Sequence, residues 1–148
     1  QASEFAGTVP VRHLLLYWKT SNRYLFSGGS VNMRDAAVYA KEENWSKAVE
    51  LWKQTYETKK GKQKMYAAYN TALGYEMQDS IDTALEWALK AQTLAREKSK
   101  TDKKETGEIH NGTISYYIFI SMYVDELEKR KEGMARLNMQ MNRFDDDF

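Results

Sequence analysis

Apolar residues recur three and four positions apart over most of the chain after residue 30, which is the spacing of one face of an α-helix. Short polar turns separate four such segments, at about residues 31–42, 47–57, 63–78 and 81–98. A longer segment with similar spacing is expected at residues 111–142. Proline occurs once and glycine eight times, so few residues interrupt these helices. The spacing therefore predicts an all-α body.

Side chains that can cap a helix stand before three of these segments. Ser30 is expected to cap the first helix, Ser46 the second, and Asp79-Ser80 the fourth. Residues 58–64 are expected to form the polar turn between the second and third helices. The helices should therefore follow one another as two pairs.

The two ends of the chain and one internal segment differ from this pattern. Residues 1–30 are rich in β-branched and aromatic residues, which predicts short strands or extended structure, although residues 14–18 also suit a helical turn. We interpret residues 1–30 as an annex, the remnant of a larger N-terminal region, with aromatic side chains that pack on the first helix pair. Residues 98–108 are charged and predict a flexible connection or a frayed helix end. Residues 143–148 are expected to be a disordered acidic tail.

Residues 35–57 and 71–93 are similar to each other. A shift of 36 residues, from Ala48 to Ala84, also aligns Ala36 with Ala72. A period of this size is typical of stacked helical repeats, in which each unit has an apolar face that its neighbour covers. Proteins built in this way usually bind other molecules rather than catalyse reactions.

The aligned positions resemble the tetratricopeptide repeat over residues 32–96. The matching residues are Ala36, Tyr39, Trp45, Ala48 and Trp52 in the first unit, and Ala72, Tyr75, Ile81, Ala84, Ala88 and Ala91 in the second. Glu43 and Asp79 stand where the family has its turn glycine, and the closing proline is missing from both units. The resemblance implies a right-handed superhelical stack of antiparallel helix pairs, with units at residues 32–60 and 64–98. The helix at residues 111–142 would then cap the last unit.

A narrower resemblance rests on the phrases YAKEENWSKAVELWKQ and AAYNTALGYEMQDSIDTALEWALKA. These look like the C-terminal half of tetratricopeptide-containing Bacteroidetes lipoproteins, a family to which no activity is assigned. In that family an export signal and a lipoprotein cysteine precede the repeats. The resemblance implies a place in the cell envelope, in the periplasm or at the surface, and a lipid anchor outside this chain. A cytoplasmic location stays open.

Charge and composition narrow the possible partners. The 22 basic and 21 acidic residues leave a net charge of +1, which disfavours binding to nucleic acid or to an anionic membrane. No apolar run approaches the length of about 20 residues that a membrane span needs. The chain has no cysteine, so disulfides, thiolate catalysis and cysteine-based metal sites are excluded.

The residues offer no convergent chemistry for an enzyme. The two histidines, His13 and His110, lie far apart in the sequence, in the annex and in the charged connection. Asp145, Asp146 and Asp147 lack the staggered spacing of a calcium loop. We therefore predict no catalytic, cofactor-binding or metal-binding residues, and no cofactor.

A groove between the first helices of the two units is the predicted binding site. Trp45, Trp52, Tyr39 and Tyr75 occupy positions where the repeat packs its own helices, so they are interpreted as scaffold. The expected groove residues are Met33, Ala37, Lys41, Tyr66, Tyr69, Asn70, Leu73, Glu76 and Met77. Exposed together, they would suit a protein or peptide segment. The alternative is that Tyr66 and Tyr69 only pack on the annex or on the long helix.

The leading hypothesis for function is a non-catalytic module for protein interaction or assembly. A peptide-carboxylate clamp is disfavoured because Met33 and Ala37 stand at two of its positions. One alternative is a purely structural domain that packs on the missing N-terminal half or self-associates. Another is that an enzymatic activity lies in that absent half.

Overall fold

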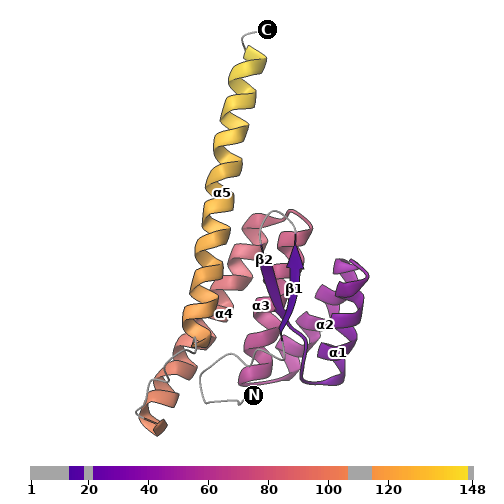
Figure 1. Cartoon of the computed structure of the whole chain (residues 1–148), viewed down its shortest axis with the longest axis vertical. Coiled ribbons are helices and arrows are strands. Elements are labelled where there is room, and N and C mark those ends of the chain that lie inside the picture. Colours follow the sequence, from indigo (N-terminus) through magenta and orange to yellow (C-terminus); the bar gives the residue numbers. More distant parts are fainter. Residues whose placement is uncertain (1–13, 19–21, 107–114, 147–148) are drawn as a thin grey trace.

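The computed structural model describes residues 14–18, 22–106 and 115–146, and it confirms an all-α fold with a long C-terminal helix (Figure 1). A β-hairpin precedes five helices in this part of the chain. The elements are β1 (Leu14–Trp18), β2 (Asn22–Phe26), α1 (Val31–Lys41), α2 (Trp45–Thr58), α3 (Lys62–Met77), α4 (Ile81–Thr106) and α5 (Tyr116–Asp146).

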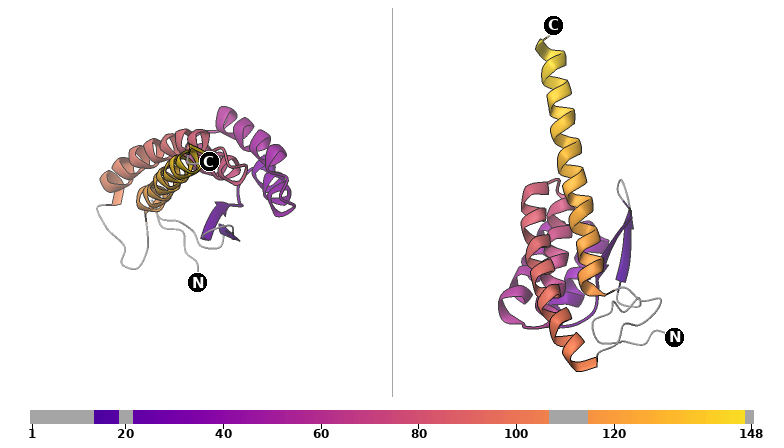
Figure 2. Two further views of the ribbon diagram at one scale, coloured as in Figure 1. Left: turned by 90° about the horizontal axis from the view of Figure 1, so that it is seen from above. Right: turned by 90° about the vertical axis from the view of Figure 1, so that its left-hand side faces the viewer.

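Helices α1 to α4 form a curved layer in which each packs on the next, and α5 packs on α4. The hairpin and α5 lie on the concave side of this layer, as the left view of Figure 2 shows. Small side chains let the helices approach closely. Ala36, Ala48, Ala72, Ala84 and Ala88 are all fully buried.

Within each helix pair, a turn joins the first helix to the second, and the two turns have the same conformation. Glu43 and Asp79 have positive φ angles of 59° and 62°, the left-handed conformation that usually selects glycine. In the first turn the Asn44 N–H donates to the Tyr39 carbonyl at 2.8 Å, and in the second the Ser80 N–H donates to the Tyr75 carbonyl at 2.9 Å. The backbone therefore repeats with the same period of 36 residues as the sequence.

The prediction of the helix caps is partly correct. The Ser30 hydroxyl accepts a hydrogen bond from the Met33 N–H, as expected. The cap of α2 is Asn44 rather than Ser46, because the helix begins at Trp45 and the Asn44 side chain accepts from the Lys47 N–H. Helix α1 ends at Lys41 and α2 begins at Trp45, so the connection is Glu42, the left-handed Glu43 and Asn44.

Three boundaries differ from expectation. Helix α4 continues to Thr106, so the expected end of this helix at residue 98 is wrong, and residues 98–106 belong to the helix rather than to a flexible connection. Helix α5 begins at Tyr116 and runs through Gly133 to Asp146 without a break. The prediction of disorder from residue 143 is therefore wrong for residues 143–146, while 147–148 lie outside the described residues.

The described part of the annex is an antiparallel hairpin, which excludes the helical turn at residues 14–18. Leu16 pairs with Tyr24, and Leu14 with Phe26. The hairpin contacts α3 through β2. The expectation that the aromatic side chains of the annex pack on the first helix pair is wrong for the described ones: Phe26 packs on Tyr66 of α3, and Tyr24 on Phe119 of α5.

The aromatic scaffold residues behave as predicted. Trp52 is fully buried, and Tyr39, Trp45 and Tyr75 are partly buried against the core. Helices α2 and α3 approach so closely here that a Cβ atom on Gly74 would lie 2.3 Å from Val49 Cγ2. Glycine at this position is therefore required by the packing.

Candidate functional site

The predicted groove residues lie in the interior of the molecule. Met33, Ala37, Tyr66, Tyr69, Asn70, Leu73 and Glu76 are buried, Met77 is half-buried, and Lys41 is exposed at the end of α1. The expectation of an open groove is not met, because β2 and α5 cover the α3 face that carries Tyr66, Tyr69 and Glu76. Tyr66 and Tyr69 instead pack on both the annex and the long helix, which is the alternative given for them from the sequence.

Two side chains of α3 bind the backbone of β2. The Asn70 amide donates from Nδ2 to the Phe26 carbonyl at 2.7 Å, and its Oδ1 accepts from the Phe26 N–H at 2.9 Å. The Tyr69 hydroxyl donates to the Tyr24 carbonyl at 2.6 Å. These contacts satisfy the strand edge that faces away from β1, much as a neighbouring strand would.

The Phe26 side chain occupies an aromatic enclosure. Its ring stacks on Tyr66 with a centroid distance of 4.2 Å and meets the Tyr69 ring edge-on at 5.1 Å. From α5, Phe119 closes the enclosure at 5.8 Å and Tyr116 at 6.1 Å. A fully buried phenylalanine among four aromatic rings fixes the end of the hairpin to both helices.

The Glu76 carboxylate lies at the centre of a buried polar network. It accepts from Arg23 Nε at 2.9 Å and from Arg23 Nη2 at 3.0 Å, so the hairpin is bound through two nitrogens. From α5, the Tyr123 hydroxyl donates at 2.9 Å and Arg130 Nη1 at 2.8 Å. The network thus joins three elements: β2, α3 and α5.

This environment keeps Glu76 ionised. Burial raises the pKa of the Glu76 carboxyl, but the hydrogen bonds from Arg23 and Arg130 outweigh it and leave the pKa below its ordinary value. Burial, together with the nearby negative charge of Glu76, raises the pKa of the Tyr123 and Tyr69 hydroxyls. A carboxylate has about four sites for hydrogen bonds, and the donors named here occupy them. Glu76 therefore has no free site with which to act as a general base.

Reasoning from the sequence missed Arg23, Arg130, Tyr123 and Phe26. A signal for the first two was present: Glu76 stands among apolar residues of α3, and a buried carboxylate needs cationic partners. Nothing in the sequence says which of the 22 basic residues supply them.

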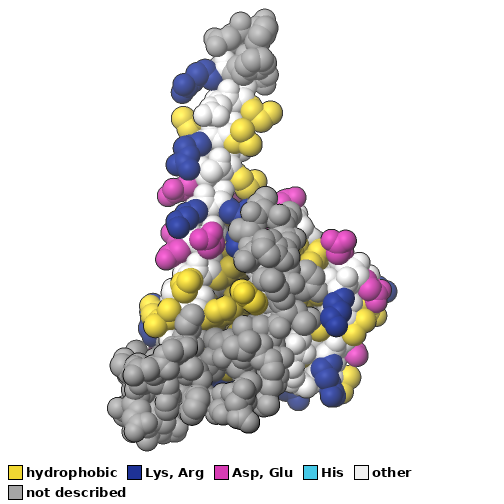
Figure 3. Space-filling model, viewed as in Figure 1, with side chains coloured by type: hydrophobic (Ala, Val, Ile, Leu, Met, Phe, Trp, Pro, Cys, Tyr) yellow, Lys and Arg dark blue, Asp and Glu magenta, His cyan; other side chains and the backbone are white. Residues whose placement is uncertain are grey.

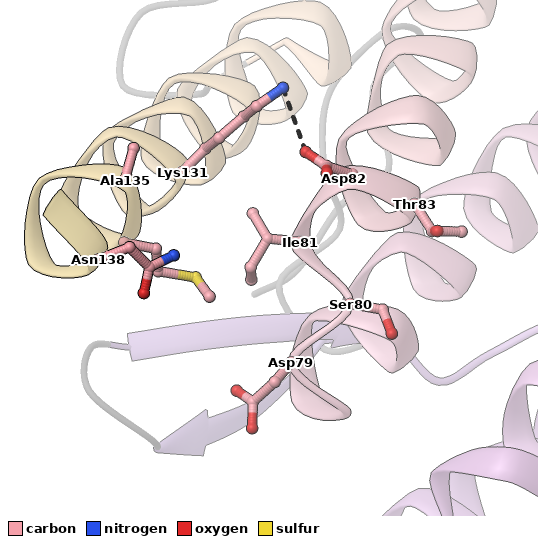
Figure 4. Close-up of a pocket in the computed structure, with 9 residues that line it drawn as sticks. Asp79, Ser80, Ile81, Asp82, Thr83, Lys131, Ala135 and Asn138 are labelled. Carbon is pink, nitrogen blue, oxygen red and sulfur yellow. Dashed lines mark ion pairs between the residues drawn. The ribbon is translucent and has the colours of Figure 1, made fainter. Parts of the chain in front are cut away.

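Two openings remain at the edges of this assembly. A pocket of about 250 Å³ between the hairpin and α5 is lined mainly by Tyr24, Tyr69, Phe119 and Met122. A larger depression of about 470 Å³ lies where α5 leaves the helical layer (Figure 4). The residues on its two sides are Asp79, Ser80, Ile81, Asp82 and Thr83 of the α4 start, and Lys131, Met134, Ala135 and Asn138 of α5.

The projecting end of α5 carries several exposed apolar side chains. Met134, Leu137 and Met141 are 42%, 55% and 57% exposed. Figure 3 shows apolar side chains along this end of the helix, which extends beyond the rest of the molecule in Figure 1. Over residues 22–106 and 115–146, no three histidine or acidic side chains come together as a metal site. Within the same part of the chain, no helix is both long and apolar enough to cross a membrane.

Comparisons with known proteins place the chain in a family. Neither a search of curated proteins nor a search of solved structures found a match. One family model matches residues 34–129, from α1 to the point where α5 leaves the helical layer. The chain therefore belongs to the family described as Domain of unknown function (DUF6340).

Proposed function

We propose that this chain is a non-catalytic assembly module of the tetratricopeptide type, in which the groove holds the hairpin and α5 docks to another polypeptide. The observation that carries the proposal is the occupation of the groove. Tyr69 and Asn70 form their hydrogen bonds with β2, and Glu76 forms its hydrogen bonds with β2 and α5, so these three polar side chains are not available to a partner. We therefore place the docking of a partner on the exposed end of α5.

The docking surface is the stripe of Met134, Leu137 and Met141, which we call the α5 stripe. An isolated helix shorter than about 12–15 residues is marginal in water, and most helices in proteins are stabilised by packing of an apolar face. The end of α5 beyond Arg130 has such a face with nothing among the described residues covering it. This arrangement favours a partner at the α5 stripe over a purely structural domain.

We propose no enzymatic role for the described residues. The buried Glu76 is saturated by its donors, and its lowered pKa suits an ion pair rather than proton transfer. A place in the cell envelope, with a lipid anchor outside the chain, is retained from the resemblance to Bacteroidetes lipoproteins. It would put the α5 stripe within reach of other envelope proteins.

Site-specific photo-crosslinking tests the docking surface. A benzophenone amino acid would replace Leu137 on the stripe, or Met139 as the matched control, in the full-length protein in its native cells. Met139 is 60% exposed but lies on the opposite side of the helix. We expect discrete crosslinked products from position 137 and none from position 139. Equal crosslinking at both positions, or none at either, would contradict the proposal and favour the purely structural alternative.

A further inference from the structure

Two aromatic rings meet at the junction of the two helix pairs. Tyr56 of α2 and Trp87 of α4 lie edge to face with a centroid distance of 5.0 Å, and both side chains are half-buried. The repeat itself does not require these rings, because a shift of 36 residues places Gln92 at the position of Tyr56 and Leu51 at that of Trp87. The ring pair is therefore a feature of the junction.

Three lysine side chains from three different helices converge on this ring pair. Lys90 Nζ lies 4.1 Å from the centroid of the Trp87 ring and 5.8 Å from that of Tyr56. Lys64 Nζ lies 4.8 Å from the Tyr56 ring. Lys53 Nζ lies 5.7 Å from the Trp87 ring. A ring attracts an ammonium group within about 6 Å of its face. The rings thus hold three positive charges in one small area, which we call the lysine cluster.

The charges of the lysine cluster are not neutralised by a direct contact. Within the described residues, none of its three ammonium groups forms an ion pair. Lys53 has Glu50 and Glu57 three and four positions away, and Lys90 has Glu86 four positions away. These spacings allow ion pairs along a helix, but an exposed pair is weak, so the rings hold the ammonium groups instead. The cluster therefore offers charged N–H donors that no carboxylate occupies.

The surrounding charges indicate which kind of anion fits the lysine cluster. Glu50, Glu57 and Glu86 are exposed on the same helices, within four positions of its lysines. They would repel a long polyanion such as nucleic acid, or the surface of an anionic bilayer. A short acidic peptide can place two or three carboxylates on the lysines without meeting these glutamates. The charge pattern therefore favours an acidic segment of a protein.

We propose that Lys53, Lys64 and Lys90 bind a short acidic segment of a partner protein, through charge-assisted hydrogen bonds from the ammonium groups to its carboxylates. The rings beneath the lysines hold the ammonium groups in place, so less side-chain freedom is lost when the segment binds. None of these residues belongs to the α5 stripe. This second contact goes beyond the proposed function, and its failure would leave that function unaffected.

Fluorescence anisotropy with a labelled hexaglutamate peptide tests the lysine cluster, with hexaglutamine as the uncharged control peptide. At about 50 mM salt we expect the purified chain to bind hexaglutamate with a Kd on the order of 100 μM, and not to bind hexaglutamine. Raising the salt to about 300 mM should weaken the binding by about tenfold or more, because salt screens exposed charges. A wild-type chain that does not bind hexaglutamate would overturn the proposal.

Variants of the lysine cluster show whether it is the binding site. The triple variant Lys53→Gln, Lys64→Gln, Lys90→Gln should bind hexaglutamate about tenfold more weakly or worse, whereas the same three positions changed to arginine should keep the affinity, because arginine retains the charge and the donors. Circular dichroism should show the same helix content in all variants. Loss of binding in the arginine variant, with its helix content unchanged, would contradict the role of the three charges.

The matched control replaces three exposed lysines outside the cluster and so changes the net charge by the same amount. It is the triple variant Lys41→Gln, Lys129→Gln, Lys131→Gln. This control should keep the wild-type affinity for hexaglutamate, and an equal loss in both glutamine variants would reduce the effect to net charge and overturn the proposal. Tighter binding to a single-stranded oligonucleotide or to phosphatidylglycerol vesicles than to hexaglutamate would overturn the acidic segment as the partner.

Discussion

Arg23 and Glu76, which are 53 positions apart in the sequence, form a buried ion pair through two nitrogens of the guanidinium group. Their side chains are 6% and 3% exposed. The pair ties the N-terminal hairpin to the second helix pair, and Arg130 adds α5 to the same carboxylate. The hairpin, α3 and α5 meet at Glu76. A substitution of Glu76 or of Arg23 should therefore weaken the packing of all three elements.

Replacement of Arg23 by methionine should destabilise the protein by about 3–5 kcal/mol, because it leaves a buried carboxylate short of a partner. Arg34→Met is the matched control, since Arg34 is exposed and should tolerate the change. Urea unfolding at neutral pH measures both. A loss of less than about 1 kcal/mol in Arg23→Met would show that the hairpin contributes little to the fold.

Acid should unfold the protein through Glu76. Its pKa is lowered from 4.5 in the folded state, so the stability it contributes is complete above about 4.5 and is lost as the pH falls through the folded-state pKa. Urea midpoints measured from pH 6 to pH 2 should fall steeply in the wild type. Glu76→Gln should be less stable at pH 6 and should show a flatter profile below pH 4.5. Parallel profiles for the two proteins would contradict the assignment.

Asn70→Leu should release the end of the hairpin. It removes both hydrogen bonds to Phe26 and leaves a buried N–H and a buried carbonyl without partners, at about 1–3 kcal/mol for each group. Hydrogen exchange measures the effect directly: the Phe26 amide should exchange much faster, while the Asn44 amide in the turn after α1 keeps its wild-type rate. Unchanged exchange at Phe26 would show that β1 alone holds the strand.

Glu43→Gly should stabilise the protein by up to about 1 kcal/mol. A left-handed conformation costs a residue with a side chain about 1–2 kcal/mol, and the greater freedom of glycine in the unfolded chain takes back part of the gain. Glu42→Gly is the control, because Glu42 has a φ of −86° and gains nothing from glycine. Thermal unfolding of the three proteins should rank Glu43→Gly highest.

Gly74→Ala should destabilise the protein by about 1–3 kcal/mol, because the added Cβ overlaps Val49. Val49→Ala on its own should also be destabilising, since it opens a cavity. The double variant should recover part of the loss, which a double-mutant cycle from urea unfolding measures as a coupling energy. If the free-energy losses of the two single variants simply add in the double variant, α2 shifts away from α3 to make room for the added Cβ.

The local features of this chain follow from short stretches of sequence. The helices, their pairing and the shift of 36 residues are visible in the spacing of apolar and small residues, because an amphipathic helix needs only its own i, i+3 and i+4 positions. The β-branched and aromatic residues of the annex favour strands, but for residues 14–18 they leave a helical turn open, and the pairing of β1 with β2 decides between the two. The sequence favours Ser46 as the cap of α2, whereas the helix begins at Trp45, because the short connection through the left-handed Glu43 depends on backbone geometry.

Only the tertiary structure decided what the groove contains. From the sequence, Tyr66 and Tyr69 suit contact with a bound peptide and packing on the annex or the long helix equally well, because an aromatic ring fits either role. The ion pair of Glu76 needs Arg23 and Arg130, which lie 53 and 54 positions away, and no periodicity links them. Such contacts depend on how whole elements pack, so the sequence determined the helices while the packing of the hairpin and α5 decided which surface stays open.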